Sequence, residues 1–225
     1  MEVYDIDLFD NTANMIASLH AAGKKVICYF SAGSYENWRV DAGQFPPATL
    51  GNQLKGWNGE KWVDTNAEAV RTIMKARMDL AVNKSCDAID PDNIDAYDNN
   101  NGLSLSQADA VSYVTFLAAE AHKRGMASGL KNGGKILSRV VGVTDFQVNE
   151  QCVQFGECAT FRPFIDQGKP VFHIEYPDPL DTASIKSSCS DVKEKGFSTL
   201  IKHMNLDEYY VACNASNTDY TTNES

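Results

Sequence analysis

The sequence predicts an α/β fold, a (β/α)8 barrel of the TIM type whose first strand lies outside this chain. Short apolar segments of strand-like composition alternate with longer segments of helical spacing, which implies parallel strands joined by right-handed crossovers. Seven strands are expected, and nearly all end in polar or ionisable residues, as in barrels whose chemistry lies at the strand C-termini. Because seven strands do not close an eight-stranded barrel, we expect the first strand to be missing or replaced. An open doubly wound sheet is the alternative, but neither GxGxxG nor GxxxxGK[ST] is present.

The expected strands follow the apolar runs in order. Residues 24–30 are apolar almost throughout, as expected of a strand buried on both faces. The expected strands cover residues 3–7, 24–30, 86–90, 126–131, 146–150, 170–176 and 198–203. Residues 36–60 contain Phe45-Pro46-Pro47 and several glycines, so we expect a long loop with at most short helical pieces.

The expected helices are marked by their ends. Gly23 and Gly125 each follow a helical pattern at a place where a C′ glycine would end it, and Ser106 with Asp109 forms a capping-box pattern. The expected helices cover residues 12–22, 66–83, 106–124, 135–140, 158–167 and 182–195. We therefore expect one barrel domain at residues 1–213, followed by a polar tail at 214–225.

Charge and composition limit the partners. The chain of 225 residues has 20 Lys+Arg, 30 Asp+Glu and a net charge of −10, with a pI of about 4.8. Phosphate neutralisation needs a basic surface, which argues against nucleic acid and anionic membrane and suits a neutral or cationic partner. No window of about 18 apolar residues predicts a membrane span, and the N-terminus has no apolar segment of signal-peptide type.

Six cysteines permit three disulfides in fifteen connectivities. Pairing the local cysteines is the simplest hypothesis, and it gives Cys152–Cys158, Cys189–Cys213 and, by remainder, Cys28–Cys86. Sequons at Asn83, Asn214 and Asn223 are compatible with secretion and glycosylation. Together these features indicate an exported glycoprotein.

The densest candidate site is the acidic run from Asp87 to Tyr97. Asp90 and Asp92 lie on one side of the predicted strand, and Pro91 ends its regular ladder. Crowded carboxylates raise one another's proton affinity, as a general acid requires. The alternative is an acidic loop that caps a helix or binds Ca²⁺, although the glycine and glutamate of a calcium loop are missing.

Further carboxylates end other strands. Glu150 follows an apolar strand next to Cys152, and a functional role is favoured over a structural ion pair with Lys131 or Lys202. For Glu175, an ion pair with one of these lysines is about as plausible as substrate contact. Asp5 and Asp7 face one side, where one of them could bind a sugar amine or a neighbouring strand. Aromatic residues could stack on sugar rings, with Trp38 and Trp62 favoured among Tyr29, Trp38, Trp57, Trp62, Tyr97 and Tyr176.

Several other chemistries are disfavoured. The sequence has no GxSxG elbow and no HExxH motif. His20 and His122 lie late in predicted helices, and His173 is expected to face away from Glu175, which disfavours a two-histidine site. A zinc site at His203 has little support, so no metal and no cofactor are expected. Two or three carboxylates with aromatic and amide neighbours remain, which are the groups that cleave glycosidic bonds.

Several long motifs occur in a distinctive order. They are V-I-C-Y-F-S-A-G-S-Y-E at 26–36, D-P-D-N-I-D at 90–95, G-L-K-N at 129–132, V-N-E-Q-C at 148–152 and I-E-Y at 174–176. With them the sequence resembles glycoside hydrolase family 114, the endo-α-1,4-polygalactosaminidases of fungi and bacteria, over most of its length. That family commonly has Glu-Pro-Asp-Asn where this chain has Asp90-Pro91-Asp92-Asn93.

The resemblance implies a (β/α)8 barrel and a secreted enzyme that cleaves α-1,4-linked galactosamine polymers internally, galactosaminogalactan among them. Asp92 and Glu150 match the family's catalytic pair, and a retaining mechanism is weakly favoured over an inverting one. The residues expected to bind substrate are Asp7, Tyr29, Asp90, Asn93, Lys131, Asn149, Glu175 and Lys202. We expect a monomer whose partner is a cationic galactosamine-containing polysaccharide. A non-catalytic carbohydrate-binding barrel and a metal-dependent deacetylase are the alternatives.

Overall fold

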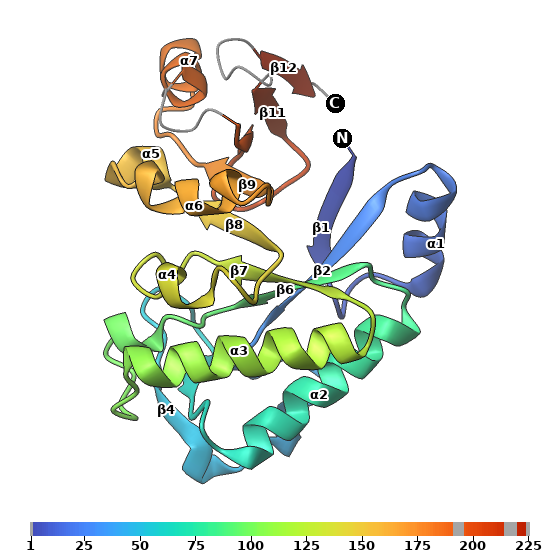
Figure 1. Ribbon diagram of the computed structural model, residues 1–225, viewed down its shortest axis with the longest axis vertical. Coiled ribbons are helices and arrows are strands. Elements are labelled where there is room, and N and C mark those ends of the chain that lie inside the picture. Colours follow the sequence, from blue (N-terminus) through green and yellow to red (C-terminus); the bar gives the residue numbers. More distant parts are fainter. Residues whose placement is uncertain (1, 191–195, 214–219, 224–225) are drawn as a thin grey trace. The chain divides into compact units, whose positions relative to one another are not determined.

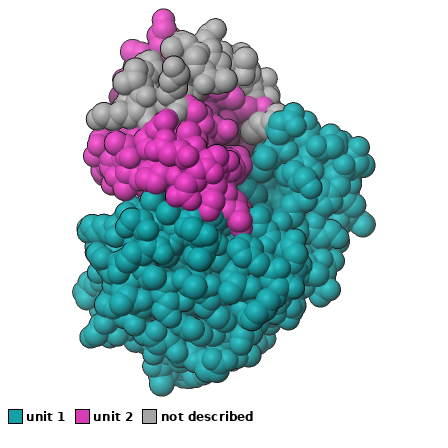
Figure 2. Space-filling model, viewed as in Figure 1, with its two compact units in different colours: residues 1–144 teal, residues 145–225 magenta. Residues whose placement is uncertain are grey.

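The computed structural model describes residues 2–190, 196–213 and 220–223. The chain forms two compact units, residues 1–144 (unit 1) and residues 145–225 (unit 2), which are coloured separately in Figure 2. Parallel strands alternate with helices in both units, so the fold is mixed α/β as predicted (Figure 1). All seven predicted strands are present among the described residues. Closure into a complete barrel and the single-domain organisation stay predictions.

The main sheet of unit 1 is parallel. Its strands are ordered β1 (Val3–Asp7), β2 (Lys25–Ser31), β6 (Ala88–Asp92) and β7 (Ala127–Lys131). The central strand β2 has an almost continuous buried run, as its apolar sequence predicts. Strand β6 continues through Pro91 to Asp92 instead of ending at residue 90, because its pairing with β7 stops at Ile89 and Pro91 therefore needs no N–H on that side.

Three helices of unit 1 connect these strands, and a fourth follows β7. They are α1 (Ala13–Ala21), α2 (Glu68–Asn83), α3 (Gln107–Lys123) and α4 (Leu137–Val140). The α3 helix begins at the predicted capping box of Ser106 and Asp109. Its buried residues recur at helical spacing, so one apolar face packs on the sheet while the other meets solvent. Figure 1 shows α2 and α3 running along the same side of unit 1.

The predicted long loop at residues 36–60 is instead part of a small antiparallel sheet. Its strands are ordered β3 (Ser34–Glu36), β5 (Glu60–Val63) and β4 (Leu50–Gln53). Two 3₁₀ turns, η1 (Ala42–Gln44) and η2 (Pro47–Thr49), lie between β3 and β4. The prediction missed these strands because they are only three or four residues long and turn-forming residues surround them. Trp62 is 4% exposed and packs with Leu54 and Ala96, so it is a core residue.

A buried ion cluster joins the small sheet to α2. Arg77 donates from Nε and Nη2 to Asp41 at 2.8 and 3.0 Å, and from Nη1 to the Ser31 carbonyl at 2.6 Å. Arg39 binds both oxygens of Asp7 and also pairs with Glu36 at 3.0 Å. Because buried charges are tolerated only when paired, this cluster fixes the segment that follows β2.

Unit 2 contains three parallel strands, followed by an antiparallel extension. The order is β8 (Phe146–Glu150), β9 (Val171–Glu175), β10 (Ser198–Ile201), β11 (Tyr210–Cys213) and β12 (Tyr220–Asn223), and the last two strands were not predicted. Its helical elements are α5 (Cys152–Phe155), η4 (Cys158–Phe161), α6 (Arg162–Asp166) and α7 (Thr182–Ser190). Residues 191–195, the end of the last predicted helix, lie outside the described residues.

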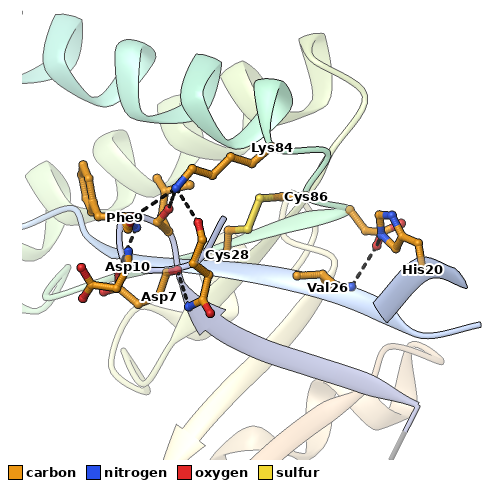
Figure 3. The surroundings of a disulfide bond; sticks show 11 residues. Asp7, Phe9, Asp10, His20, Val26, Cys28, Lys84 and Cys86 are labelled. Carbon is orange, nitrogen blue, oxygen red and sulfur yellow. Dashed lines mark hydrogen bonds and ion pairs between the residues drawn. A yellow bond between two sulfur atoms is a disulfide. The ribbon is translucent and has the colours of Figure 1, made fainter. Parts of the chain in front are cut away.

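All three predicted disulfides are present: Cys28–Cys86, Cys152–Cys158 and Cys189–Cys213. Figure 3 shows the first of them, which links β2 to the segment before β6. Beside it, Lys84 Nζ donates to the carbonyls of Leu8, Phe9 and Asn11 at 2.7, 3.2 and 2.6 Å and so holds the turn after β1. Within the described part of the chain, no helix has both the length and the apolar composition needed to span a bilayer.

Candidate active site

Unit 1 brings several predicted site residues together at the C-terminal ends of its parallel strands. The register pairs Tyr29 with Asp90 and Ser31 with Asp92. Lys131 Nζ lies 3.7 Å from one oxygen of Asp90 and 3.7 Å from one oxygen of Asp92, and 5.2 Å from the centre of the Tyr29 ring. Neighbouring strands of a parallel sheet end at one edge, so polar residues at the strand ends meet there. We call Asp5, Tyr29, Asp90, Asp92 and Lys131 the acidic cluster.

The Asp92 carboxylate is held from two sides. The Tyr29 hydroxyl donates to Oδ2 at 3.0 Å, and the backbone N–H of Asn93 donates to Oδ1 at 2.7 Å. Asn93 has a left-handed backbone with φ of 59°, which turns the chain sharply after the strand. These donors fix the orientation of the carboxylate, as a nucleophile or an electrostatic stabiliser requires.

The crowding of carboxylates changes proton affinities in unit 1. Asp5 is an exposed residue, but the side chains around its carboxyl group desolvate it. This desolvation, and next the nearby carboxylate of Asp90, raise the pKa of Asp5 well above its usual value. Burial and the nearby Asp92 charge raise the pKa of Asp95 to about 6. Burial, followed by the Asp92 charge, also raises the pKa of Tyr29, so its hydroxyl remains a donor at neutral pH.

Asp5→Asn is expected to stabilise the fold at neutral pH and to lose this advantage in acid. A raised pKa means that the folded state binds the proton more tightly. The Asp5 carboxyl of the wild type therefore contributes to folding stability below its unfolded pKa of about 3.9, and this contribution is lost as pH rises through its folded pKa. Thermal melts between about pH 3 and pH 8 should show a Tm difference that grows with pH. Asp10→Asn, at an exposed acid in the turn just after β1, is the control, and a Tm difference between Asp5→Asn and wild type that shrinks with rising pH would contradict the expectation.

Glu150 lies at the end of β8 in unit 2. Tyr176, which is 8% exposed, donates its hydroxyl to Glu150 Oε1 at 2.6 Å. The next residue, Gln151, has a left-handed backbone with φ of 63°, and the Cys152–Cys158 disulfide follows directly. A strand end, a fixed turn and a disulfide together restrict the backbone that carries this carboxylate.

The structure corrects the prediction for His173. This residue does not face away from Glu175: its Nε2 lies 2.8 Å from Glu175 Oε1 inside unit 2, and its Nδ1 lies 3.1 Å from the Thr199 hydroxyl. Residues two apart in a strand share a face, which explains the contact. Glu175 Oε1 also accepts from the Val153 N–H at 2.7 Å. Glu175 thus anchors the first turn of α5, two residues beyond Glu150.

Other predicted site residues have identifiable structural partners. The Asp7 carboxylate pairs with Arg39 and accepts from the N–H groups of Phe9 and Asp10. Lys202 Nζ donates to the carbonyls of Asp207 and Tyr209 at 2.7 and 2.9 Å, and Asn149 is fully buried. Substrate binding by Asp7, Asn149, Glu175 and Lys202 therefore stays a prediction. Of the two favoured tryptophans, Trp38 is 52% exposed and available for stacking, whereas Trp62 is in the core.

The sequence reasoning missed four residues around Asp92. Asp95 is in the acidic run but was not singled out, and Ser31, Ser34 and Glu60 contact Asn93 directly or through one another. The motif at residues 26–36, which contains both serines, was the available signal for Ser31 and Ser34, whereas Glu60 stood in the segment predicted as loop.

One group of side chains in the described residues has the spacing of a metal site: Cys152, Cys158 and His173. The two cysteines form a disulfide, so they offer no thiolate to a metal ion.

Comparison with known proteins identifies relatives. The model of glycoside-hydrolase family GH114 matches residues 1–218. The crystal structure of Aspergillus fumigatus Ega3 in complex with galactosamine is similar with 50% identity and a TM-score of 0.92, over 94% of this chain and 88% of that chain. The glycoside hydrolase domain of PelA from Pseudomonas aeruginosa shares the fold, with 13% identity and a TM-score of 0.73, over 94% and 91% of the two chains. No curated protein matches the sequence.

Proposed function

This chain belongs to glycoside-hydrolase family GH114 and is a glycoside hydrolase, and we propose that it cleaves α-1,4-linked galactosamine polysaccharide internally. The similar Ega3 structure was determined in complex with galactosamine, which supports an amino sugar as the substrate unit. The net charge of −10 and the acidic cluster suit a polymer whose amines are protonated at neutral pH.

We assign two carboxylates to the chemistry. Asp92 is the nucleophile that attacks the anomeric carbon, and Glu150 is the general acid that protonates the departing glycosidic oxygen. Water then attacks the glycosyl-enzyme ester with Glu150 acting as base, so the configuration is retained. Each step conserves protons: the proton that Glu150 gives to the leaving sugar is recovered from the attacking water.

One observation carries this proposal: the Asp92 carboxylate is held by Tyr29 and Asn93 at a strand end, with Lys131 and Asp90 beside it. Fixed donors on both oxygens orient an ionised carboxylate toward an incoming carbon centre and cost no reorganisation during the reaction. The cation of Lys131 stabilises the negative charge of the cluster before and after the attack.

Asn93, Lys131, Asp90 and Tyr29 would shape the substrate site around Asp92. Disulfides persist mainly in oxidising compartments, so the three bridges support secretion. An extracellular enzyme would meet a secreted polysaccharide without a transport step. We infer that the chain acts outside the cell as a monomer.

Galactosamine oligomers of defined length provide the test. The protein should release reducing ends, and the product sizes should show internal cleavage, with equal rates in the presence and absence of a chelator. Release of acetate without new reducing ends, abolished by the chelator, would indicate a metal-dependent deacetylase. Binding without any product would indicate a non-catalytic carbohydrate-binding protein, and either result would overturn the proposal.

A further inference from the structure

The turn between β2 and β3 is docked on the end of β6. The N–H groups of Ala32 and Gly33 donate to the Asp92 carbonyl at 2.9 and 3.0 Å. A Cβ atom added at Gly33 would lie 1.7 Å from the Asn93 carbonyl oxygen, so only glycine permits this approach. The carbonyl of Gly33 accepts from the N–H of Val63 at 3.0 Å, which ties the turn to β5. The backbone at Asp92 is thus held by the small sheet as well as by β2.

A chain of side-chain hydrogen bonds follows the same path. Asn93 Nδ2 donates to Ser31 Oγ at 2.9 Å, the hydroxyls of Ser31 and Ser34 lie 2.6 Å apart, and Ser34 donates to Glu60 Oε2 at 2.7 Å. The Ser34 hydroxyl has a single proton, which it gives to Glu60, so Ser31 must donate to Ser34. While Glu60 is ionised, the direction of every bond in the chain is therefore determined, from the Asn93 amide to the Glu60 carboxylate. Burial raises the pKa of Glu60, so this order holds at pH values above that raised pKa.

This chain is shielded from solvent. Ser31, Ser34 and Glu60 are 1%, 0% and 6% exposed. Charge-assisted hydrogen bonds in such surroundings are strong, and a bond at one end polarises the next. Burying a carboxylate is unfavourable in itself, and apolar residues of similar volume often stabilise a fold at least as well. Stability of the small sheet alone therefore does not account for Glu60.

We propose that Ser31, Ser34 and Glu60 are positioning residues, which act through Asn93 to fix the orientation of the Asp92 carboxylate. The Asn93 side chain is held by Ser31, while its backbone N–H binds Asp92 Oδ1 at 2.7 Å. With both ends held, the left-handed conformation of Asn93 is maintained and the carboxylate cannot turn away from the substrate. The inference rests on the proposed role of Asp92 in glycoside cleavage.

Kinetics with galactosamine oligomers test the proposal. Ser34→Ala should lower kcat by about 10- to 100-fold, the loss expected from a small misplacement of a reacting group, with KM nearly unchanged. Glu60→Met, which removes the acceptor, should have a similar effect, whereas Glu60→Gln keeps an acceptor oxygen and should restore most of kcat. The matched control is Thr49→Val, because Thr49 is a buried residue beside the same small sheet and, among the described residues, its hydroxyl donates to the Pro46 carbonyl and takes no part in the chain.

A double-mutant cycle separates a connected chain from two independent effects. The effect of Ser34→Ala combined with Glu60→Met should be much smaller than the product of the single effects, because either change breaks the same chain. If the variants have wild-type kcat, or if Glu60→Gln is as slow as Glu60→Met, the positioning role is wrong.

The NMR signal of the Asn93 backbone N–H provides a readout that does not need turnover. It should shift in Ser34→Ala and stay in place in Thr49→Val. If the wild-type protein is inactive but the Asn93 signal still shifts in Ser34→Ala, the proposed function is refuted. The same result would support the hydrogen-bonded chain as the structure that orients Asp92. An unchanged signal would overturn the positioning role whether or not the protein is active.

Discussion

Asp92→Asn is expected to lower kcat on galactosamine oligomers by on the order of 10⁴-fold or more, because the variant lacks the atom that forms the glycosyl-enzyme ester. The amide oxygen of the variant can still accept from the Asn93 N–H, and its amide nitrogen can donate to the Tyr29 hydroxyl oxygen, so folding and the position of the side chain should be preserved. Affinity for the oligomer, measured calorimetrically, should change much less than kcat. Thermal melts verify that the variant is folded.

A control variant and a rescue experiment accompany Asp92→Asn. Asp98→Asn, which changes an exposed acid six residues along the chain, should leave kcat unchanged. Azide added to Asp92→Asn should restore turnover and give a glycosyl azide of inverted configuration, because the anion replaces the missing nucleophile. A variant that keeps more than about a tenth of wild-type kcat would show that Asp92 does not attack the sugar.

Glu150→Gln is expected to lower kcat by roughly 10²- to 10⁴-fold, the contribution of general acid–base catalysis. The amide cannot donate the proton that the leaving sugar needs, but it can still accept from the Tyr176 hydroxyl. The loss should be much smaller for an oligomer with a good aryl leaving group, which departs without protonation. Binding of the oligomer should remain nearly as tight as in the wild type.

Glu157→Gln is the matched control for this second variant, because Glu157 is exposed and lies beside Cys158 in the same unit. The configuration of the first product, followed by NMR, reports the mechanism: an α-anomer indicates retention and a β-anomer indicates inversion. Equal losses on natural and aryl substrates would contradict the acid role, since protonation of the leaving group would then not limit the rate.

Much of the fold could be predicted because its signals are local. The apolar run at 24–30 predicts a buried strand, and the Ser106 capping box predicts the start of α3; the structure contains both. The disulfides could also be predicted, because cysteines near in sequence pair at low loop-closure cost and leave Cys28 and Cys86 as the last pair. The small antiparallel sheet could not, since its short strands are stabilised by partners far along the chain.

The sequence by itself determined the parallel β/α pattern, the cysteine pairs and the set of polar residues at the strand ends. Only the tertiary structure decided what each of these residues contacts. In the folded chain, Asp7 forms an ion pair with Arg39 and Trp62 lies in the core. Glu60 is linked to Asn93 through the hydroxyls of two serines. The physical reason is that periodicity and turn chemistry act between neighbours in sequence, whereas the charge, burial and orientation of a site residue depend on groups that folding brings from distant segments.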